Sequence, residues 1–133
     1  MSKRILLVGH CGPDTSYLKI AVRSAAPDAA VQSASDQAHV DRALAEGVDL
    51  MLLNRELDGE FQLTSGIELI RRLKSSHPKL KLMLVSNYPE AQAAALAAGA
   101  LPGFGKRDLH SPKAIESIKA ALNHEAEEKT STN

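Results

Sequence analysis

Short apolar runs recur along the chain and alternate with longer amphipathic segments. Continuous runs cover residues 5–8, 50–53 and 80–85, the last with one polar interruption, and weaker runs cover 29–32 and 101–104. Strands that are buried on both faces, as in a parallel sheet, are apolar at every position rather than at alternate positions. The pattern therefore predicts five strands, and the three continuous runs indicate a parallel sheet.

The segments between the runs have the apolar spacing of helices and are bounded by helix-capping and helix-ending residues. Pro at the first helical position and Gly just beyond the last one are the typical start and stop. The predicted helices run from the capping residues 14–16 to Pro27, over 36–47, 65–78 and 89–99, and onward from 111–112. A strand followed by a helix, five times over, predicts an α/β fold with a doubly wound, five-stranded parallel sheet.

Length and composition favour a single domain. The chain has 133 residues, which suits one domain with its own apolar core. Residues 1–124 carry the alternating pattern, whereas residues 125–133 are polar and have no periodicity. We expect 1–124 to form the domain, and 125–133 to extend the last helix or to form a disordered tail.

Charge and hydropathy argue against several classes of function. Sixteen basic and sixteen acidic side chains cancel, which gives no support for a nucleic-acid-binding face or a basic membrane anchor. No apolar run approaches the roughly 18 residues of a membrane span, and the run at 5–8 is too short for a secretion signal. Cys11 is the single cysteine, so no intrachain disulfide can form. We expect a cytoplasmic protein whose domain binds neither nucleic acid nor membrane.

The functional crevice of a doubly wound sheet lies at the carboxyl ends of its strands. Polar residues that follow the predicted strands include His10, Asn54, Ser86 and Lys106. His10 and Cys11 are adjacent, so their side chains leave the strand on opposite sides and are poorly placed to share a metal ion. We therefore expect no metal site there.

Four motifs that fall in order along residues 3–124 resemble those of the response-regulator receiver family. Residues 49–54 resemble the family's third strand, which ends in the phosphoacceptor aspartate, and residues 66–73 resemble its third helix. Residues 84–86 resemble the strand that ends in Ser or Thr, and residues 99–106 resemble the stretch that ends in an invariant Lys. The resemblance implies the flavodoxin-like receiver fold with five helices and a role in two-component, phosphorelay-type signal transduction.

The sequence departs from the family at each of its three acidic positions. Asn54 stands at the phosphoacceptor position, and Gly9 and His10 stand at the acidic pair that holds the divalent cation, whereas Ser86 and Lys106 match. An amide is a very poor nucleophile, and Mg²⁺ prefers carboxylate oxygens. We expect a pseudo-receiver that is not an enzyme, has no catalytic residue, takes no phosphoryl group at the usual site and has lost Mg²⁺ binding.

The crevice is expected to be more positive than that of the family. The sequence predicts a hydrogen bond from Lys106 to the amide oxygen of Asn54, with Ser86 in the same network and Arg55 at the rim. Such a crevice offers an alternative function, the sensing of a small anion or metabolite. A third hypothesis is residual phosphotransfer through another residue, such as His10 or Asp14.

The helix predicted at 89–99 is nearly all alanine and carries little charge. In the receiver family the surface of the fourth helix, fifth strand and fifth helix mediates dimerisation and output. The resemblance therefore implies a protein partner or a homodimer through this surface. High helix propensity alone also explains the alanines, and the sequence leaves both interpretations open.

Overall fold

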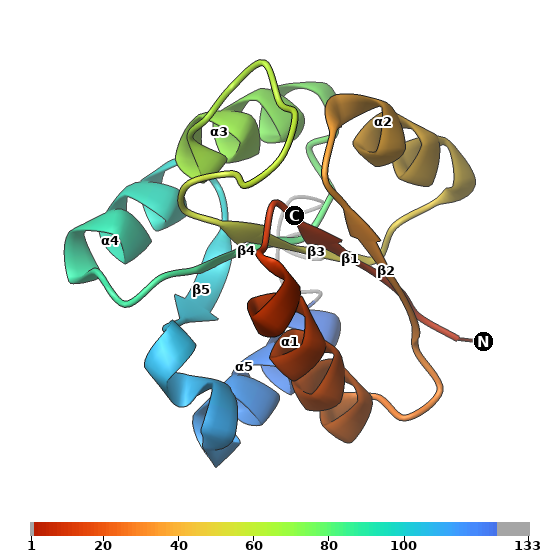
Figure 1. The fold of residues 1–133 in the computed structure, drawn as a ribbon, viewed down its shortest axis with the longest axis vertical. Helices are drawn as coiled ribbons and strands as arrows, with labels where there is room; N and C mark the ends of the chain where they lie inside the picture. The colour runs from red at the N-terminus through yellow and green to blue at the C-terminus, as the bar shows by residue number, and fades with distance from the viewer. Residues whose placement is uncertain (1, 125–133) are drawn as a thin grey trace, which may run out of the picture.

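The computed structural model describes residues 2–124, in which strands and helices alternate from β1 to α5 (Figure 1). The strands are β1 (Arg4–Val8), β2 (Ala30–Ala34), β3 (Leu50–Asn54), β4 (Leu82–Val85) and β5 (Leu101–Phe104). The helices are α1 (Gly12–Ala25), α2 (Gln37–Glu46), α3 (Gly66–Ser76), α4 (Pro89–Ala97), the short 3-10 helix η1 (Lys106–His110) and α5 (Pro112–Leu122). The predicted α/β order is confirmed. The predicted tail at 125–133 lies outside the described residues.

The five strands form one parallel sheet in the order β2-β1-β3-β4-β5. The chain runs from β1 outward to β2 and then returns past β1 to β3, so the strand order reverses between β1 and β3. Every residue of β3 and β4 is buried, as the continuously apolar runs predict for strands covered on both faces. The doubly wound sheet is therefore confirmed.

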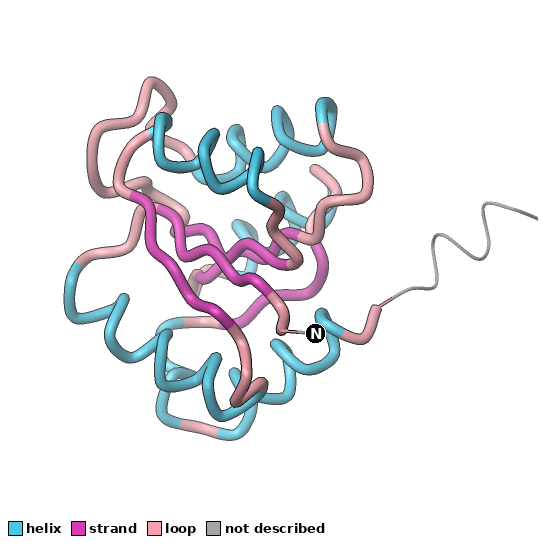
Figure 2. The backbone as a smooth tube through the Cα atoms, turned by 90° about the vertical axis from the view of Figure 1, so that its right-hand side faces the viewer, coloured by secondary structure: helices cyan, strands magenta, loops and turns pink. Residues whose placement is uncertain are grey.

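Helices cover both faces of this sheet, as two perpendicular views show (Figures 1 and 2). Helices α1 and α5 pack on one face, where Leu18, Val22 and Ile118 are fully buried. Helices α2, α3 and α4 pack on the other face, where Val40 and Ile70 are fully buried. The core is aliphatic apart from a few aromatic side chains, in keeping with the scarcity of aromatic residues.

Most helix starts agree with the predicted caps. Asp36 and Ser65 accept hydrogen bonds from backbone N–H groups in the first turns of α2 and α3, as N-cap residues do. Helix α1 is the exception, because it begins at Gly12 with Cys11 as its N-cap rather than at residues 14–16. Pro13 is tolerated in the first helical turn, where its missing N–H has no intrahelical partner to lose. Asp14 consequently lies inside the helix.

Strand β5 forms an edge of the sheet and pairs irregularly with β4. Met83 lies opposite Leu101 and Val85 lies opposite Phe104, so β5 has one more residue than β4 between the paired positions. That extra length contains Pro102 and Gly103. No helix within the described residues is long and apolar enough to cross a membrane.

Candidate functional site

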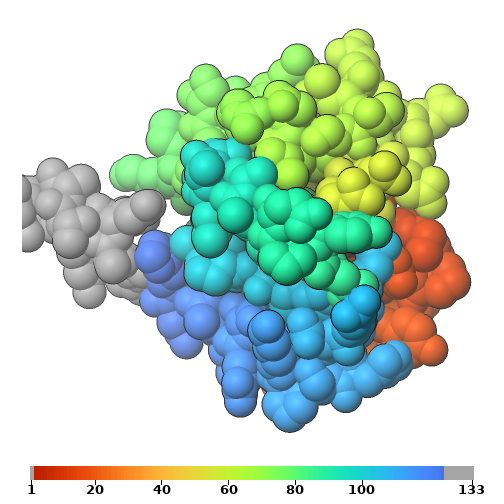
Figure 3. All heavy atoms as spheres, turned by 90° about the vertical axis from the view of Figure 1, so that its left-hand side faces the viewer, coloured from red at the N-terminus to blue at the C-terminus, as the bar shows by residue number. Residues whose placement is uncertain are grey.

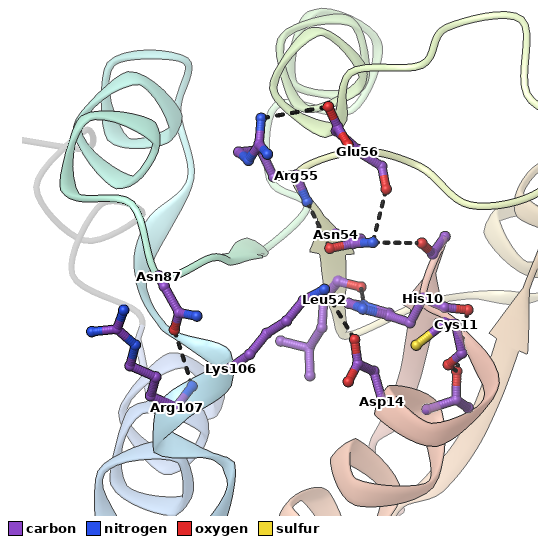
Figure 4. A network of polar contacts seen from close by, with 12 residues as sticks. His10, Cys11, Asp14, Leu52, Asn54, Arg55, Glu56, Asn87, Lys106 and Arg107 are labelled. Atoms are coloured by element: carbon purple, nitrogen blue, oxygen red, sulfur yellow. Dashed lines mark hydrogen bonds and ion pairs between the residues drawn. The ribbon is translucent and has the colours of Figure 1, made fainter.

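The carboxyl ends of β1, β3, β4 and β5 meet at one edge of the sheet around a cleft of about 500 Å³. The cleft brings together the predicted crevice residues Asn54, Arg55, Ser86 and Lys106. Figure 4 shows Asn54, Arg55 and Lys106 at this edge of the sheet. Its lining is Cys11, Asn54, Arg55, Glu56, Leu57, Asp58, Val85, Ser86, Asn87, Tyr88 and Lys106. Gly9 and His10 lie beside this cleft and are not among its lining residues.

Asn54 ends β3 and turns its amide toward backbone groups rather than toward Lys106. Its Nδ2 donates hydrogen bonds to the carbonyl oxygens of Gly9, at 3.0 Å, and Glu56, at 2.8 Å. Its Oδ1 accepts from the backbone N–H of Arg55 at 3.1 Å. The predicted bond from Lys106 to Asn54 is wrong, because the Lys106 ammonium nitrogen pairs instead with Asp14. Figure 4 shows Asn54 held in this way between two loops.

Gly9 lies beneath a side chain of the long loop that follows β3. Its backbone is left-handed, with φ of 73°, and a Cβ added to it would come within 2.7 Å of Leu57 Cδ2. Leu57 is 8% exposed, and the next residue, Asp58, donates its backbone N–H to the Gly9 carbonyl at 2.9 Å. A side chain of any kind at position 9 would meet both backbone strain and the leucine.

His10 is largely buried, and its ring makes one hydrogen bond to protein. Its Nε2 lies 2.9 Å from the carbonyl oxygen of Leu52, so Nε2 carries the proton and donates it. Nδ1 is buried and has no hydrogen-bond partner within the described residues. Burial lowers the pKa of His10 to about 4; the bond to Leu52 and nearby Asp14 oppose this, and Lys106 adds to it. The ring is therefore neutral at physiological pH.

Lys106 pairs with Asp14, which the first turn of α1 places across the cleft. The Lys106 ammonium nitrogen lies 3.0 Å from Asp14 Oδ2. Burial raises the pKa of Asp14, but hydrogen bonds from Lys106 and Cys11 outweigh it and leave the pKa below its usual value. The positive charge of Lys106 is therefore already balanced inside the protein.

The remaining crevice residues are also occupied by internal contacts. Ser86 is 5% exposed, and its hydroxyl oxygen accepts from the backbone N–H of Tyr88 at 3.2 Å. The Arg55 guanidinium lies 4.7 Å from the centre of the Tyr88 ring and 3.8 Å from the Glu56 carboxylate. Ser86 thus acts as a cap at the end of β4, and Arg55 is part of the cleft lining.

No family model matches the chain, and no curated protein matches its sequence. Several solved structures match its fold. The signal receiver domain of an HD domain-containing protein from Pseudomonas fluorescens Pf-5 aligns over 97% of this chain and 93% of its own, with a TM-score of 0.76 and 21% identity. The signal receiver domain of a DNA-binding response regulator from Colwellia psychrerythraea 34H aligns over 92% and 100%, with a TM-score of 0.72 and 19% identity. The chain has the receiver fold.

The beryllofluoride-activated NtrC4 receiver domain dimer has the same fold. It aligns over 90% of this chain and 95% of its own, with a TM-score of 0.72 and 18% identity. At identities near 20% the likeness establishes the fold alone, and function has to be argued from the residues of this chain.

A divalent cation is the group that the receiver fold implies at this edge, and the side chains present do not fit it. Gly9 supplies no ligand, and the unprotonated nitrogen of His10, Nδ1, is a softer donor than the carboxylate oxygens that Mg²⁺ prefers. Asn54 presents its amide nitrogen to the loop. Within residues 2–124 no three His, Cys, Asp or Glu side chains gather closely enough to hold a metal ion.

Reasoning from the sequence missed the partner of Asp14 and the position of Leu57. Asp14 was assigned to helix capping and to a hypothesis of residual phosphotransfer, and its pairing with Lys106 depends on α1 starting at Gly12. Leu57 lies in a loop without periodicity, and its position over Gly9 depends on long-range backbone contacts of that loop. Two features of the sequence could have pointed to these contacts. Pro13 precedes the capping residues and is tolerated in a first helical turn, and the loop between Asn54 and Gly66 is long enough to fold back over the strand ends.

Proposed function

We propose that the chain is an atypical receiver domain of two-component signal transduction that is not phosphorylated at the usual site. It acts in the cytoplasm through protein–protein contacts and not as an enzyme. The observation that carries the proposal is the double hydrogen bond from the Asn54 amide nitrogen to the carbonyls of Gly9 and Glu56. An aspartate carboxylate at this position has no N–H to donate, so the surrounding loops suit an amide and not the phosphoacceptor.

The environment of Gly9 supports the same proposal. Receiver phosphorylation uses a carboxylate as nucleophile and Mg²⁺ to neutralise the developing charge. Leu57 occupies the space that a side chain at position 9 would need, and His10 is buried and neutral. Restoring the nucleophile alone would therefore leave the cation without carboxylate ligands at positions 9 and 10.

The test is a backbone amide NMR titration of the full chain with Mg²⁺, followed by beryllofluoride as a phosphoryl mimic. We expect no saturable, Mg²⁺-dependent shifts around Asn54, Ser86 and Lys106. Fluoride added with Mg²⁺ but without beryllium serves as the blank for ionic-strength effects. Saturable shifts at these residues that require both Mg²⁺ and beryllofluoride would overturn the proposal.

Sensing of a small anion is the weaker candidate function. The charge of Lys106 is balanced by Asp14, and Asn54 and Ser86 already bond to the backbone. An anion entering the cleft would have to compete with these internal partners. The contacts of the cleft therefore favour a structural role for its polar residues.

The partner surface that we propose is the face made by α4, β5 and α5, and the partner is a second copy of this chain. Leu96 on α4 is 48% exposed, and its neighbours Ala93 and Ala97 are exposed as well. A shallow notch of about 260 Å³ lies at the start of β5 and the end of α5. Its lining is Leu101, Pro102, Ser117, Ala120, Ala121 and His124.

Leu96 and the notch lie at the same end of β5, because α4 ends just before that strand begins and α5 ends beside it. A two-fold arrangement requires that the same patch serve both copies. One exposed leucine and one mostly apolar notch on the same face meet that requirement. The activated NtrC4 receiver domain with the same fold is a dimer. Figure 3 shows this side of the molecule, with α4 in teal and η1 in blue.

The interface is tested by sedimentation equilibrium over a range of protein concentrations. We expect a concentration-dependent dimer that Leu96→Glu converts to a monomer. Ile20→Glu is the matched control, because Ile20 is an exposed apolar residue of another helix, α1, at 62% exposure. A monomer at all concentrations, or equal loss of the dimer in both variants, would refute the homodimer and leave a different protein as the partner of this face.

A further inference from the structure

Gln92 of α4 binds the sheet through three backbone carbonyls. Its Nε2 lies 3.0 Å from the carbonyl oxygen of Leu84, 3.0 Å from that of Ser86 and 3.2 Å from that of Phe104. The first two belong to β4 and the residue after it, and the third ends β5. A side-chain amide has two N–H groups, so one of them is shared between two carbonyls. One residue thus connects the helix to two adjacent strands.

The irregular pairing of β5 creates the place for this amide. Leu84 lies between the paired positions of β4, opposite the stretch where β5 has its extra residue. Pro102 in that stretch has no N–H to donate to the ladder. A Cβ at Gly103 would overlap the carbonyl oxygen of Leu84 and lie 2.9 Å from Gln92 Oε1. The absence of a side chain at Gly103 therefore lets the Gln92 amide reach the Leu84 carbonyl.

The other contacts that hold α4 in place are small. The helix has nine residues, and those it buries are Ala91 and Ala95, whose methyl groups are the smallest apolar side chains. Its N-cap residue, Tyr88, makes no side-chain hydrogen bond to the helix. Backbone groups that are buried need partners, and Gln92 donates to three carbonyls, of which that of Phe104 also accepts from the backbone N–H of Ser86 at 3.0 Å. Gln92 is therefore a principal attachment of α4 to the sheet.

We propose that Gln92 locks α4 against the ends of β4 and β5, so that the partner face is preformed in a single conformation and needs no activating signal. This inference rests on the proposed function, since it concerns how the α4–β5–α5 face is regulated. A shift of α4 along the sheet would break hydrogen bonds to Leu84, Ser86 and Phe104 at once. An alternative position of the helix would take the Gln92 donor away from the carbonyls of Leu84 and Ser86, which is unfavourable, whereas the Phe104 carbonyl would keep its bond from the Ser86 N–H.

The test combines amide hydrogen exchange with NMR relaxation dispersion on the full chain. Gln92→Glu keeps the shape of the side chain but removes both N–H donors and places carboxylate oxygens against carbonyl oxygens. We expect amides of α4 to exchange about tenfold faster or more than in the wild type, because local opening becomes cheaper. The wild type is expected to show no microsecond-to-millisecond exchange in α4 and β5.

Gln92→Ala provides a milder variant, in case the glutamate prevents folding, and should show the same local effect. Gln37→Ala is the matched control, because Gln37 is a helical glutamine whose amide nitrogen bonds to one exposed side chain, Asp41. Amides of β1 and β3 report on global unfolding. In the Gln92 variants their protection against exchange should fall much less than the protection of the α4 amides. A wild type that already exchanges between two states, or a Gln92→Ala variant with unchanged α4 protection, would overturn the lock.

These measurements use the isolated chain and need no partner. A failure of the dimer test would therefore remove the proposed interface and leave the lock standing. An absence of the local effect of Gln92 would remove the lock and leave the proposed interface standing.

Discussion

The buried ring of His10 should make the stability of the fold depend strongly on pH. Protonation at Nδ1 would add a donor that faces no acceptor within the described residues and would bury a positive charge. Burial accordingly lowers the pKa of His10 from 6.5 to about 4. The bond to the Leu52 carbonyl and the nearby carboxylate of Asp14 oppose this effect, whereas the Lys106 ammonium adds to it.

The sign of the effect follows from which state binds the proton first. An unfolded chain protonates His10 near pH 6.5, whereas the folded protein resists until about pH 4. Stability is therefore fully present above pH 6.5 and falls as the pH decreases toward 4. At about 1.4 kcal/mol per pKa unit, the loss is roughly 2 to 3 kcal/mol by pH 4.5. That is a large fraction of the roughly 5–15 kcal/mol that stabilises an ordinary domain.

The assay is urea unfolding followed by far-ultraviolet circular dichroism at pH 7.5, 6.5, 5.5 and 4.5. His10→Gln keeps a side-chain N–H for the Leu52 carbonyl but does not titrate, so its stability should fall much less over this range. His77→Gln alters an exposed histidine at the end of α3 and should retain the wild-type fall. Equal pH dependence in His10→Gln and the wild type would refute the reasoning.

Three further substitutions test the site. Asn54→Asp should leave the Mg²⁺ and beryllofluoride titration silent and lower the urea midpoint, because it removes the donors to two carbonyls. Asp14→Asn should lower the free energy of unfolding by about 0.5 kcal/mol, the usual contribution of a partly exposed ion pair. A double-mutant cycle with Lys106→Gln should give a coupling energy of the same size between the two side chains. Gly66→Ala should lower the free energy of unfolding in urea by at least about 2 kcal/mol, since the added Cβ would overlap the Asn54 carbonyl. Gly12→Ala is the control and should leave stability nearly unchanged, because a Cβ there meets open space.

The fold was predictable because its signals are local. Continuously apolar strands such as 50–53 and 82–85 need only a few neighbouring residues to be recognised, and Asp36 and Ser65 mark helix starts by their own hydrogen bonds. The start of α1 was missed because residues 14–16 are typical helix caps and were expected to mark its start. The helix begins earlier, at Gly12, since Pro13 is tolerated in a first helical turn. Because of this earlier start, Asp14 lies in the first turn of the helix, where its side chain pairs with Lys106, and does not cap the helix.

The interior of the site was less predictable, because it depends on contacts between distant segments. Asn54, Ser86 and Lys106 do gather in one cleft, as the strand ends require. Which of them bond to one another depends on the loop that carries Leu57 and on the position of Asp14, and neither follows from local sequence. The sequence analysis therefore identified Asn54, Ser86 and Lys106 as members of the site, missed Leu57 and misassigned the partner of Lys106.

The outer edge of β5 has a consequence for how the chain avoids aggregation. An open sheet edge offers unpaired N–H and C=O groups to any passing strand. Strand β5 spans four residues, includes Pro102 and pairs out of step with β4, and each of these features disfavours the addition of a further strand. A molecule that approaches this edge therefore has to be recognised through side chains, and the face can expose apolar groups without inviting the growth of a continuous intermolecular sheet.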